Sequence, residues 1–325
     1  MTVTPPSDLH RPAGFDEEAD FRPSASLAAA LRAHGAGCGC AMHRRRLFGA
    51  SLLAAGATIA APSLAQDGVQ LDKQSQLAKL VPAEEIEAAA AKQYAAMLAE
   101  ASKGRALAPA DHPQLVRLRA IAQQMIPFIG SPNLRSTPRA AQWKWEVNLI
   151  GSKELNAFCM PGGKIAFYTG ILQQLQLDDD EVSMTMGHEI AHALREHARE
   201  RMGKTAATRI GANVVSALLG LGSLGDAALG MGAQLLTLRF SREDESEADL
   251  VGLDLAARGG YNPRAGISLW QKMGAASKGA PPQFLSTHPS GPSRIKEIEA
   301  ILPAVEPLFS RAPKPARRFA PMKAA

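Results

Sequence analysis

The sequence is poor in cysteine and in aromatic residues, and the scarcity of cysteine excludes a fold held together by disulfides. Three of its 325 residues are cysteine and 5% are aromatic. Cys38 and Cys40 precede a segment that is typical of an export signal, so Cys159 alone would remain and a disulfide framework is excluded. A single thiol in an exported protein can be reactive, but the apolar neighbours of Cys159 favour a buried side chain.

A basic groove interleaved with aromatic residues is also missing. The net charge is +5, but much of the excess lies near the ends of the chain, in Arg44, Arg45, Arg46, Lys314, Arg317, Arg318 and Lys323. Nucleic acid is therefore not expected as a partner. With 46% hydrophobic residues, the chain can bury one substantial core or two modest ones.

The first 65 residues are expected to lie outside the folded domain. Residues 1–41 are rich in proline and alanine and are expected to be unstructured or to precede the true start, with Met42 as an alternative initiator. Residues 42–65 begin with a basic cluster and continue in an uncharged, alanine-rich run. This run ends in small residues, which predicts signal peptidase cleavage near Ala65.

The signal resembles a particular bacterial export route. Arg45 and Arg46 stand before Leu47-Phe48, as in a twin-arginine signal. An uncleaved membrane anchor is the alternative, because the run approaches spanning length. Pro62 and the small residues favour cleavage, so the mature protein would begin near Gln66 and work in the periplasm.

Residues 66–311 are expected to form one α+β domain, mostly helical with a small sheet beside the helix that holds the metal. Hydrophobic periodicity predicts a helix from about Pro82 to Gly104 and a second from Asp111. Alternation and turn residues predict three strands, at 143–150, 154–160 and 164–170. Strands followed by helices indicate an α+β fold. The Pro/Arg/Lys-rich residues 312–325 are expected to be disordered.

A glycine-rich apolar segment occupies residues 205–240. Its longest uncharged stretch, 210–225, has 16 residues, which is short of the roughly 20 that span a bilayer. We expect two buried or partly exposed helices that flank the site. A membrane hairpin is the alternative, and peripheral contact with a membrane through 205–240 is left open.

The stretch "GHEIAHALREH" carries the main chemical signal. His188 and His192 are four residues apart, so a helix places both imidazoles on one face, one turn apart. Asp178 and Glu181 form a capping box that starts this helix. In the H-E-x-x-H pattern the histidines hold zinc and the glutamate, here Glu189, is the general base. The alternative is a surface helix with incidental histidines.

A third metal ligand has to come from another segment, because catalytic zinc usually takes three protein ligands. His197 lies five residues past His192 and would point about 140° round the helix, toward solvent or the backbone. The stretch "SREDESEADLVGLDL" offers Glu245, with Asp249 one turn later to orient a ligating histidine. Spacing alone does not distinguish Glu245 from its neighbours Glu243, Asp244 and Glu247.

Three motifs in this order, HEIAH, ESEAD and LSTHPS, resemble those of metallopeptidase family forty-eight. Its branches include the CAAX prenyl endopeptidase, the HtpX heat-shock protease and the mitochondrial Oma-type protease. The resemblance covers about 143–302 and implies a gluzincin-type fold with one zinc ion per chain. It makes Glu245 the third ligand and Asp249 its supporting carboxylate, and leaves Glu247 as a bystander. Because membrane helices are missing, the chain is most similar to soluble, exported bacterial members.

His288 in "LSTHPSGPSRI" has two interpretations. Taken alone it is a turn histidine before a proline, whereas the resemblance implies that it stabilises the oxyanion or occupies the open metal position in a resting state. The expected function is a periplasmic zinc endopeptidase that hydrolyses misfolded or damaged envelope proteins, bound along an exposed strand edge at 164–170. The alternative is a chaperone-like module with structural zinc, although structural sites usually have four ligands, often cysteines.

Overall fold

The structure is a computed structural model that describes residues 68–208, 231, 234–276, 283–288 and 292–323. Residues 1–41 and the expected signal peptide at 42–65 lie outside these ranges, as does most of 205–240. The described residues form many helices and one small sheet, so the expected fold class is confirmed. No helix in the described ranges has both the length and the hydrophobicity of a membrane-spanning helix.

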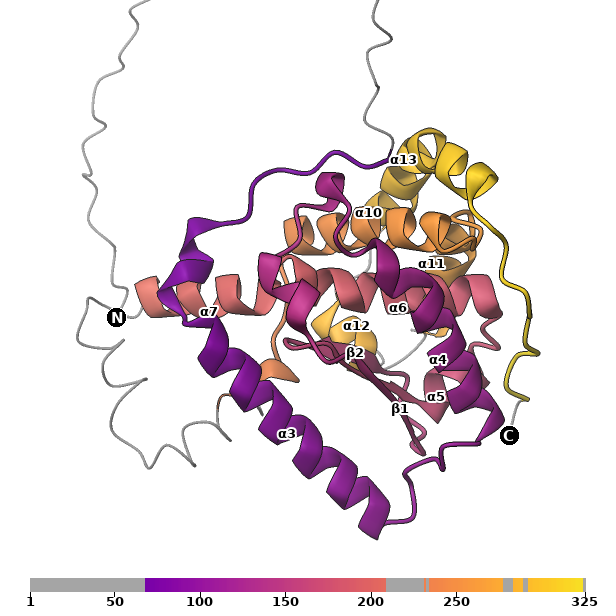
Figure 1. Ribbon diagram of the computed structural model, residues 1–325, viewed down its shortest axis with the longest axis horizontal. Coiled ribbons are helices and arrows are strands. Elements are labelled where there is room, and N and C mark those ends of the chain that lie inside the picture. The colour runs from indigo at the N-terminus through magenta and orange to yellow at the C-terminus, as the bar shows by residue number, and fades with distance from the viewer. Residues whose placement is uncertain (1–67, 209–230, 232–233, 277–282, 289–291, 324–325) are drawn as a thin grey trace, which may run out of the picture. The chain divides into compact units, whose positions relative to one another are not determined.

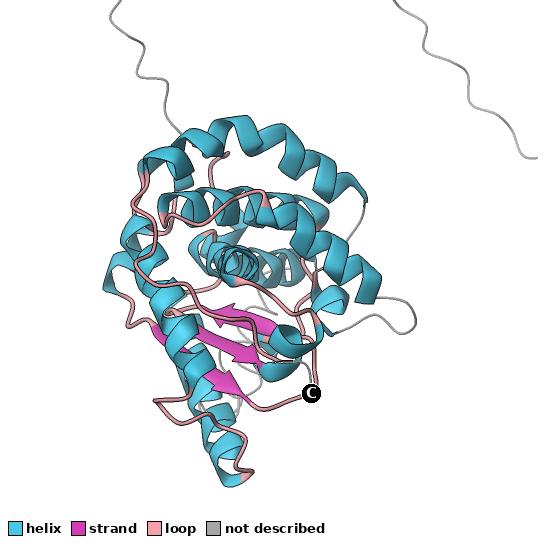
Figure 2. Cartoon of the chain, turned by 90° about the vertical axis from the view of Figure 1, so that its right-hand side faces the viewer, coloured by secondary structure: helices cyan, strands magenta, loops and turns pink. Residues whose placement is uncertain are grey.

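The sheet has three strands, β1 (Glu146–Ile150), β2 (Ala157–Met160) and β3 (Lys164–Tyr168), in the order β1-β3-β2. β3 pairs in parallel with β1 and antiparallel with β2, and Figure 2 shows the strands side by side in magenta. Residues 164–170 were expected to supply an exposed edge, and this prediction is wrong because β3 is the central strand. In the described part of the chain, β2 is an edge strand instead.

Two glycines explain the turn between β2 and β3. Gly162 and Gly163 have φ angles of +86° and +76°, a region that favours glycine. A Cβ on Gly163 would also lie 2.9 Å from the Trp145 ring. The chain can therefore fold back tightly and pair β2 with β3.

The sheet separates two hydrophobic clusters. Leu149 and Phe167 belong to the main core, whereas Ile150 and Ala166 pack with Tyr94 on the other face. The alternation along 143–150 is typical of a half-buried strand whose polar face, with Asn148, points to solvent. Asn148 is instead buried and donates a hydrogen bond to the Tyr94 hydroxyl at 3.1 Å, because helix α3 (Ala83–Lys103) covers that face.

Two long helices position the site. α6 (Asp179–Leu194) is buried along nearly its whole length and starts with the expected capping box. α10 (Arg242–Arg258) packs along α6, as Figure 1 shows. Ser241 and Asp244 form a second capping box at its start. The two boxes fix where each helix begins, and therefore which side chains face the other helix.

The other helices of the described residues lie around this pair and the sheet. They are α4 (Pro113–Met125), α5 (Thr169–Gln174), α7 (His197–Thr208), α11 (Ala265–Ala276), α12 (Gln283–Thr287) and α13 (Pro292–Arg311). The described residues also contain four short 3-10 helices, at Gln76–Leu80, Ile126–Phe128, Pro132–Leu134 and Pro138–Gln142. α13 packs against α10 on the side away from the sheet (Figure 1).

The C-terminal segment 312–323 is extended chain fastened to the domain, in place of the disorder expected for 312–325. The Phe319 N–H donates to Asp179 Oδ2 at 2.8 Å, and Arg318 pairs with Asp180 at 2.7 Å. These contacts hold the segment against the first turn of α6.

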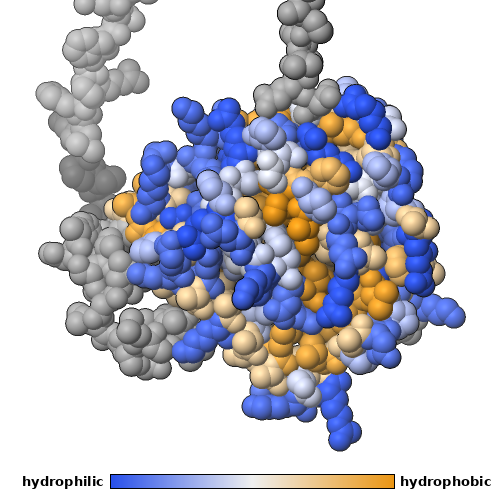
Figure 3. Space-filling model, in the orientation of Figure 1, coloured by the Kyte–Doolittle hydropathy of each residue, from blue (hydrophilic) through white to orange (hydrophobic). Residues whose placement is uncertain are grey.

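The surface drawn in Figure 3 is largely hydrophilic, with hydrophobic residues showing in its centre and at its lower edge. Leu80 and Val116 are exposed large hydrophobic side chains in the described part, at 43% and 37%. Most apolar side chains of the described residues are therefore used in packing.

Candidate metal centre

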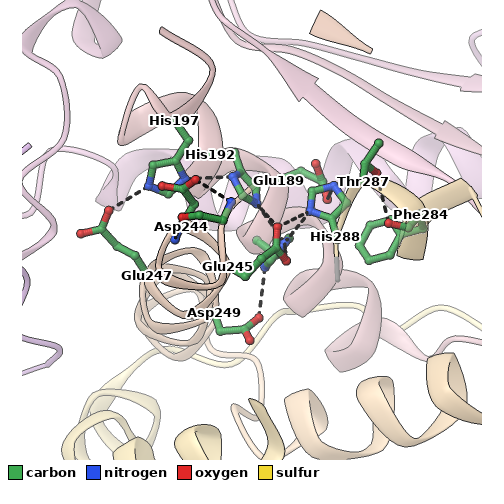
Figure 4. Close-up of polar contacts among 12 residues, drawn as sticks. Glu189, His192, His197, Asp244, Glu245, Glu247, Asp249, Phe284, Thr287 and His288 are labelled. Atoms are coloured by element: carbon green, nitrogen blue, oxygen red, sulfur yellow. Dashed lines mark hydrogen bonds and ion pairs between the residues drawn. The ribbon is translucent and has the colours of Figure 1, made fainter. Parts of the chain in front are cut away.

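Four side chains converge between α6 and α10. His188 and His192 project from one face of α6, with their Nε2 atoms 3.1 Å apart. Glu245 reaches them from α10, with one oxygen 3.6 Å from His188 Nε2 and the other 3.5 Å from His192 Nε2. His288 Nδ1 lies 3.0 Å from Glu245 Oε1. All four are buried, and Figure 4 shows His192, Glu245 and His288 facing one another.

The donor set fits a metal ion. In tetrahedral coordination with bonds of 2.0–2.1 Å, neighbouring ligand atoms are about 3.3 Å apart. The Nε2 atoms of His188 and His192 are 3.1 Å apart, while Glu245 places Oε2 3.6 Å from the first nitrogen and Oε1 3.5 Å from the second. Burial lowers the pKa of both histidines, with that of His192 well below its ordinary value. Neutral imidazole is the form that binds metal, so these residues could hold a divalent cation.

Asp249 contacts the ring nitrogen of His188 that faces away from the ligand group. Its Oδ1 lies 3.0 Å from His188 Nδ1. Burial raises the pKa of Asp249, but Arg294 and His188 outweigh it and lower the pKa to about 2. The ionised carboxylate can only accept, so the proton lies on Nδ1 and the lone pair of Nε2 points into the ligand group. Asp249 therefore lies where a carboxylate can orient the His188 ring.

Arg294 joins the two carboxylates and was not anticipated from the sequence. Its guanidinium donates to Glu245 Oε2 at 2.6 Å and to Asp249 Oδ2 at 2.7 Å. The same group lies 3.6 Å from the centre of the Trp270 ring. Arg294 therefore neutralises charge that would otherwise be buried without a cation. The need for such a cation beside two buried acids was the signal available in the sequence.

Glu189 faces a cavity beside the ligand group. Its carboxylate is buried, and Oε1 has no hydrogen-bond partner among the described residues. Burial raises the pKa of Glu189 to about 7. The carboxylate and β2 line the same cavity of about 60 Å³. This group can accept a proton at neutral pH, as a general base must.

His288 connects the ligand group with Glu189. Its ring is 4% exposed and stacks on Phe284, with centroids 4.5 Å apart. Nδ1 is 3.2 Å from His188 Nε2, while Nε2 is 3.6 Å from Glu189 Oε1. His288 is therefore buried between the ligand group and Glu189.

The expectation for His197 is wrong, and its neighbour Glu247 makes a contact that the sequence did not indicate. His197 was expected to face solvent or the backbone, yet its Nδ1 lies 2.9 Å from Nδ1 of His192. Helical extrapolation failed because α6 ends at Leu194 and the chain turns at Glu196, where φ is +59°. Glu247, expected to be a bystander, is not among the candidate ligands, but its Oε2 lies 2.8 Å from His197 Nε2 (Figure 4).

The other rivals for the third ligand have separate explanations. Asp244 accepts from the Ser241 N–H in the capping box. Glu243 is exposed in the first turn of α10, where a negative charge complements the helix dipole. Neither belongs to the group of side chains that could hold a metal.

Comparison with known families agrees with this geometry. The model of peptidase family M48 matches residues 114–302, which is more than half of the chain and contains the whole ligand group. The chain belongs to peptidase family M48. The family expected from the HEIAH, ESEAD and LSTHPS motifs is thereby confirmed.

Several curated M48 peptidases are similar to this chain. It is 34% identical over 206 residues to the mitochondrial metalloendopeptidase OMA1 of Schizosaccharomyces pombe, covering 62% of this chain and 57% of that protein. It is 28% identical over 196 residues to the metalloprotease LoiP of Escherichia coli, covering 59% and 72%. It is 28% identical over 159 residues to the beta-barrel assembly-enhancing protease of Yersinia pestis, covering 46% and 32%. The chain thus spans less than two thirds of the first and third of these M48 relatives.

Proposed function

We propose that this M48 peptidase is a zinc-dependent endopeptidase with one zinc ion per chain, held by His188, His192 and Glu245. The observation that carries the proposal is the convergence of these buried side chains, with the two histidine Nε2 atoms 3.1 Å apart and each 3.5–3.6 Å from an oxygen of Glu245. When bound, zinc polarises the scissile carbonyl and acidifies the attacking water. Two histidines and one carboxylate leave a position open for that chemistry.

Glu189 is proposed as the general base. It accepts a proton from the water that attacks the scissile carbonyl and passes it to the leaving amine. His288 lies beside Glu189 and is proposed to assist it. The His288 ring can donate a hydrogen bond to the scissile carbonyl oxygen as negative charge develops on that oxygen. In the resting protein, His288 Nδ1 lies within the ligand group, so the same ring can also fill the fourth position.

The substrate is proposed to bind along β2. The strand pairs with β3 on one side, and its residues line the cavity that holds Glu189 and His192. An added strand gains main-chain hydrogen bonds that are independent of sequence. Such binding requires an extended peptide, which supports unfolded or misfolded proteins as substrates.

The proposed setting is the bacterial periplasm. Support comes from the twin-arginine-like residues 42–65, with cleavage near Ala65, and from the similarity to a protease named for enhancing beta-barrel assembly. Misfolded or damaged envelope proteins would then be the substrates. Membrane contact through 205–240 concerns residues that lie largely outside the described ones. A chaperone-like binding role has less support, because Glu189 faces the cavity and is not one of the candidate ligands.

The Glu189→Gln variant tests the proposed reaction. It should retain about one zinc ion per chain by atomic emission but lose hydrolysis of casein, because the amide cannot accept the proton. Glu243→Gln is the matched control, since Glu243 is exposed on α10, and should cleave at the parent rate. Casein hydrolysis by Glu189→Gln at the parent rate would overturn the general-base assignment.

A further inference from the structure

His192 is held by two residues that are not candidate ligands. Phe240 stacks on its ring, with centroids 3.9 Å apart and an interplanar angle of 25°. His197 approaches its edge, with the two Nδ1 atoms 2.9 Å apart. His197 is 1% exposed, so water does not compete for this contact. The outer nitrogen of His192 is therefore occupied while Nε2 faces the ligand group.

The two hydrogen bonds that link His192 to His197 and His197 to Glu247 can both be donated in the direction of Glu247. The Glu247 carboxylate only accepts, so Nε2 of His197, 2.8 Å from Glu247 Oε2, carries a proton. A neutral His197 then has its lone pair on Nδ1 and accepts from the Nδ1–H of His192. That tautomer leaves a lone pair on His192 Nε2, which is the form that binds a metal.

Glu247 is itself anchored. Arg195 Nη2 donates to Glu247 Oε1 at 2.6 Å. The Arg195 guanidinium also donates to the carbonyl oxygens of Asp72 at 2.9 Å and Arg135 at 3.0 Å. The chain of hydrogen bonds from His192 through His197 therefore ends at the ion pair between Glu247 and Arg195. Arg195 in turn is bonded to the backbone of two segments that are distant in the sequence.

We propose that His197 is a positioning residue for the metal centre. With Glu247 it fixes the ring orientation and the proton position of His192, as Asp249 does directly for His188. Outer hydrogen-bond partners of ligating histidines have this effect in metal sites generally. The inference rests on the proposed zinc site and adds His197 and Glu247 to the residues that build it.

Zinc affinity, measured by competition with a chelating dye, tests the proposal on the full chain. His197→Phe keeps a ring but has no acceptor for His192, so zinc should bind about 10–100-fold more weakly. His197→Asn puts a carbonyl oxygen near the position of Nδ1 and should recover part of the loss. Glu247→Ala should also weaken zinc binding, whereas the exposed Glu243→Ala on the same helix should bind zinc like the parent.

Two further measurements separate positioning from stability. The visible spectrum of the Co²⁺-loaded protein reports ligand geometry, and it should change in His197→Phe but not in Glu243→Ala. Thermal unfolding in excess chelator measures separately the stability that His197→Phe loses with its two buried polar contacts. A His197→Phe variant that melts earlier without metal, yet binds zinc and Co²⁺ like the parent, would overturn the proposal. A parent protein that binds no zinc would instead overturn the proposed function.

Discussion

Gly187 on α6 and Gly252 on α10 face each other in the contact between the two helices. A Cβ on Gly252 would lie 2.9 Å from the backbone nitrogen of His188, and a Cβ on Gly187 would lie 2.9 Å from the Gly252 Cα. Real Cβ contacts are not this short, so the close packing depends on both glycines. This approach lets Glu245 of α10 reach the histidines of α6.

Gly252→Ala should therefore damage stability and metal binding together. The added methyl pushes α10 away from α6, and overpacking of this kind costs about 1–3 kcal/mol of unfolding free energy. Zinc affinity should fall as well, because Glu245 moves with its helix. Chemical denaturation and chelator competition measure the two effects.

Gly274→Ala is the control for this substitution. Gly274 lies in helix α11, and a Cβ there would meet nothing within 4 Å. The change should leave zinc affinity unaltered and stabilise the protein by up to about 1 kcal/mol, since alanine favours a helix more than glycine. Equal behaviour of Gly252→Ala and Gly274→Ala would contradict the proposed helix contact.

Arg294→Gln should destabilise the metal-free protein strongly. The substitution leaves the carboxylates of Glu245 and Asp249 buried without a cation, and breaking a buried pair costs about 3–5 kcal/mol. Bound zinc should reduce this loss, because it supplies positive charge. Arg264→Gln breaks the more exposed pair with Glu306 and should cost less than about 1 kcal/mol. Similar losses for both variants in denaturant titrations would refute the role given to Arg294.

The metal-free protein should also show a pH effect from Glu189. Burial raises its pKa from 4.5 to about 7, so the folded state binds this proton more tightly than the unfolded state. The stability that protonated Glu189 contributes is full below the pKa of the unfolded state and is lost as pH rises through about 7. In chelator, Glu189→Gln should match the parent near pH 5 and exceed it at pH 8, by on the order of 2–3 kcal/mol. No gain at pH 8 would show that the carboxylate ionises freely.

The part of the site that lies on one helix could be predicted from the sequence. His188, Glu189 and His192 are fixed relative to one another by helix geometry, and the capping box fixes where that helix begins. Glu245 required the family resemblance, because spacing left its acidic neighbours on α10 open. In physical terms, Glu245 differs from those neighbours because the packing of α10 on α6 turns its side chain toward the histidines.

The rest depends on features that local patterns do not encode. His197 was misplaced because the left-handed residue Glu196 breaks the helix before it. Arg294 comes from α13, which is far along the sequence from the acids that it neutralises. The order β1-β3-β2 depends on which side of the hairpin accepts β1. Alternation along one strand carries no information on that choice.

The zinc content of purified variants after dialysis, measured by atomic emission, tests the central assignment most directly. The parent and the exposed Glu243→Ala should retain about one zinc ion per chain, because their three ligands are intact. Glu245→Ala leaves only His188 and His192 and should retain almost none, whereas Asp249→Ala should keep part of its zinc, since losing an outer partner typically costs about 10–100-fold in affinity. A Glu245→Ala protein that still carries about one zinc ion per chain would contradict the account, because the third ligand would then be another residue.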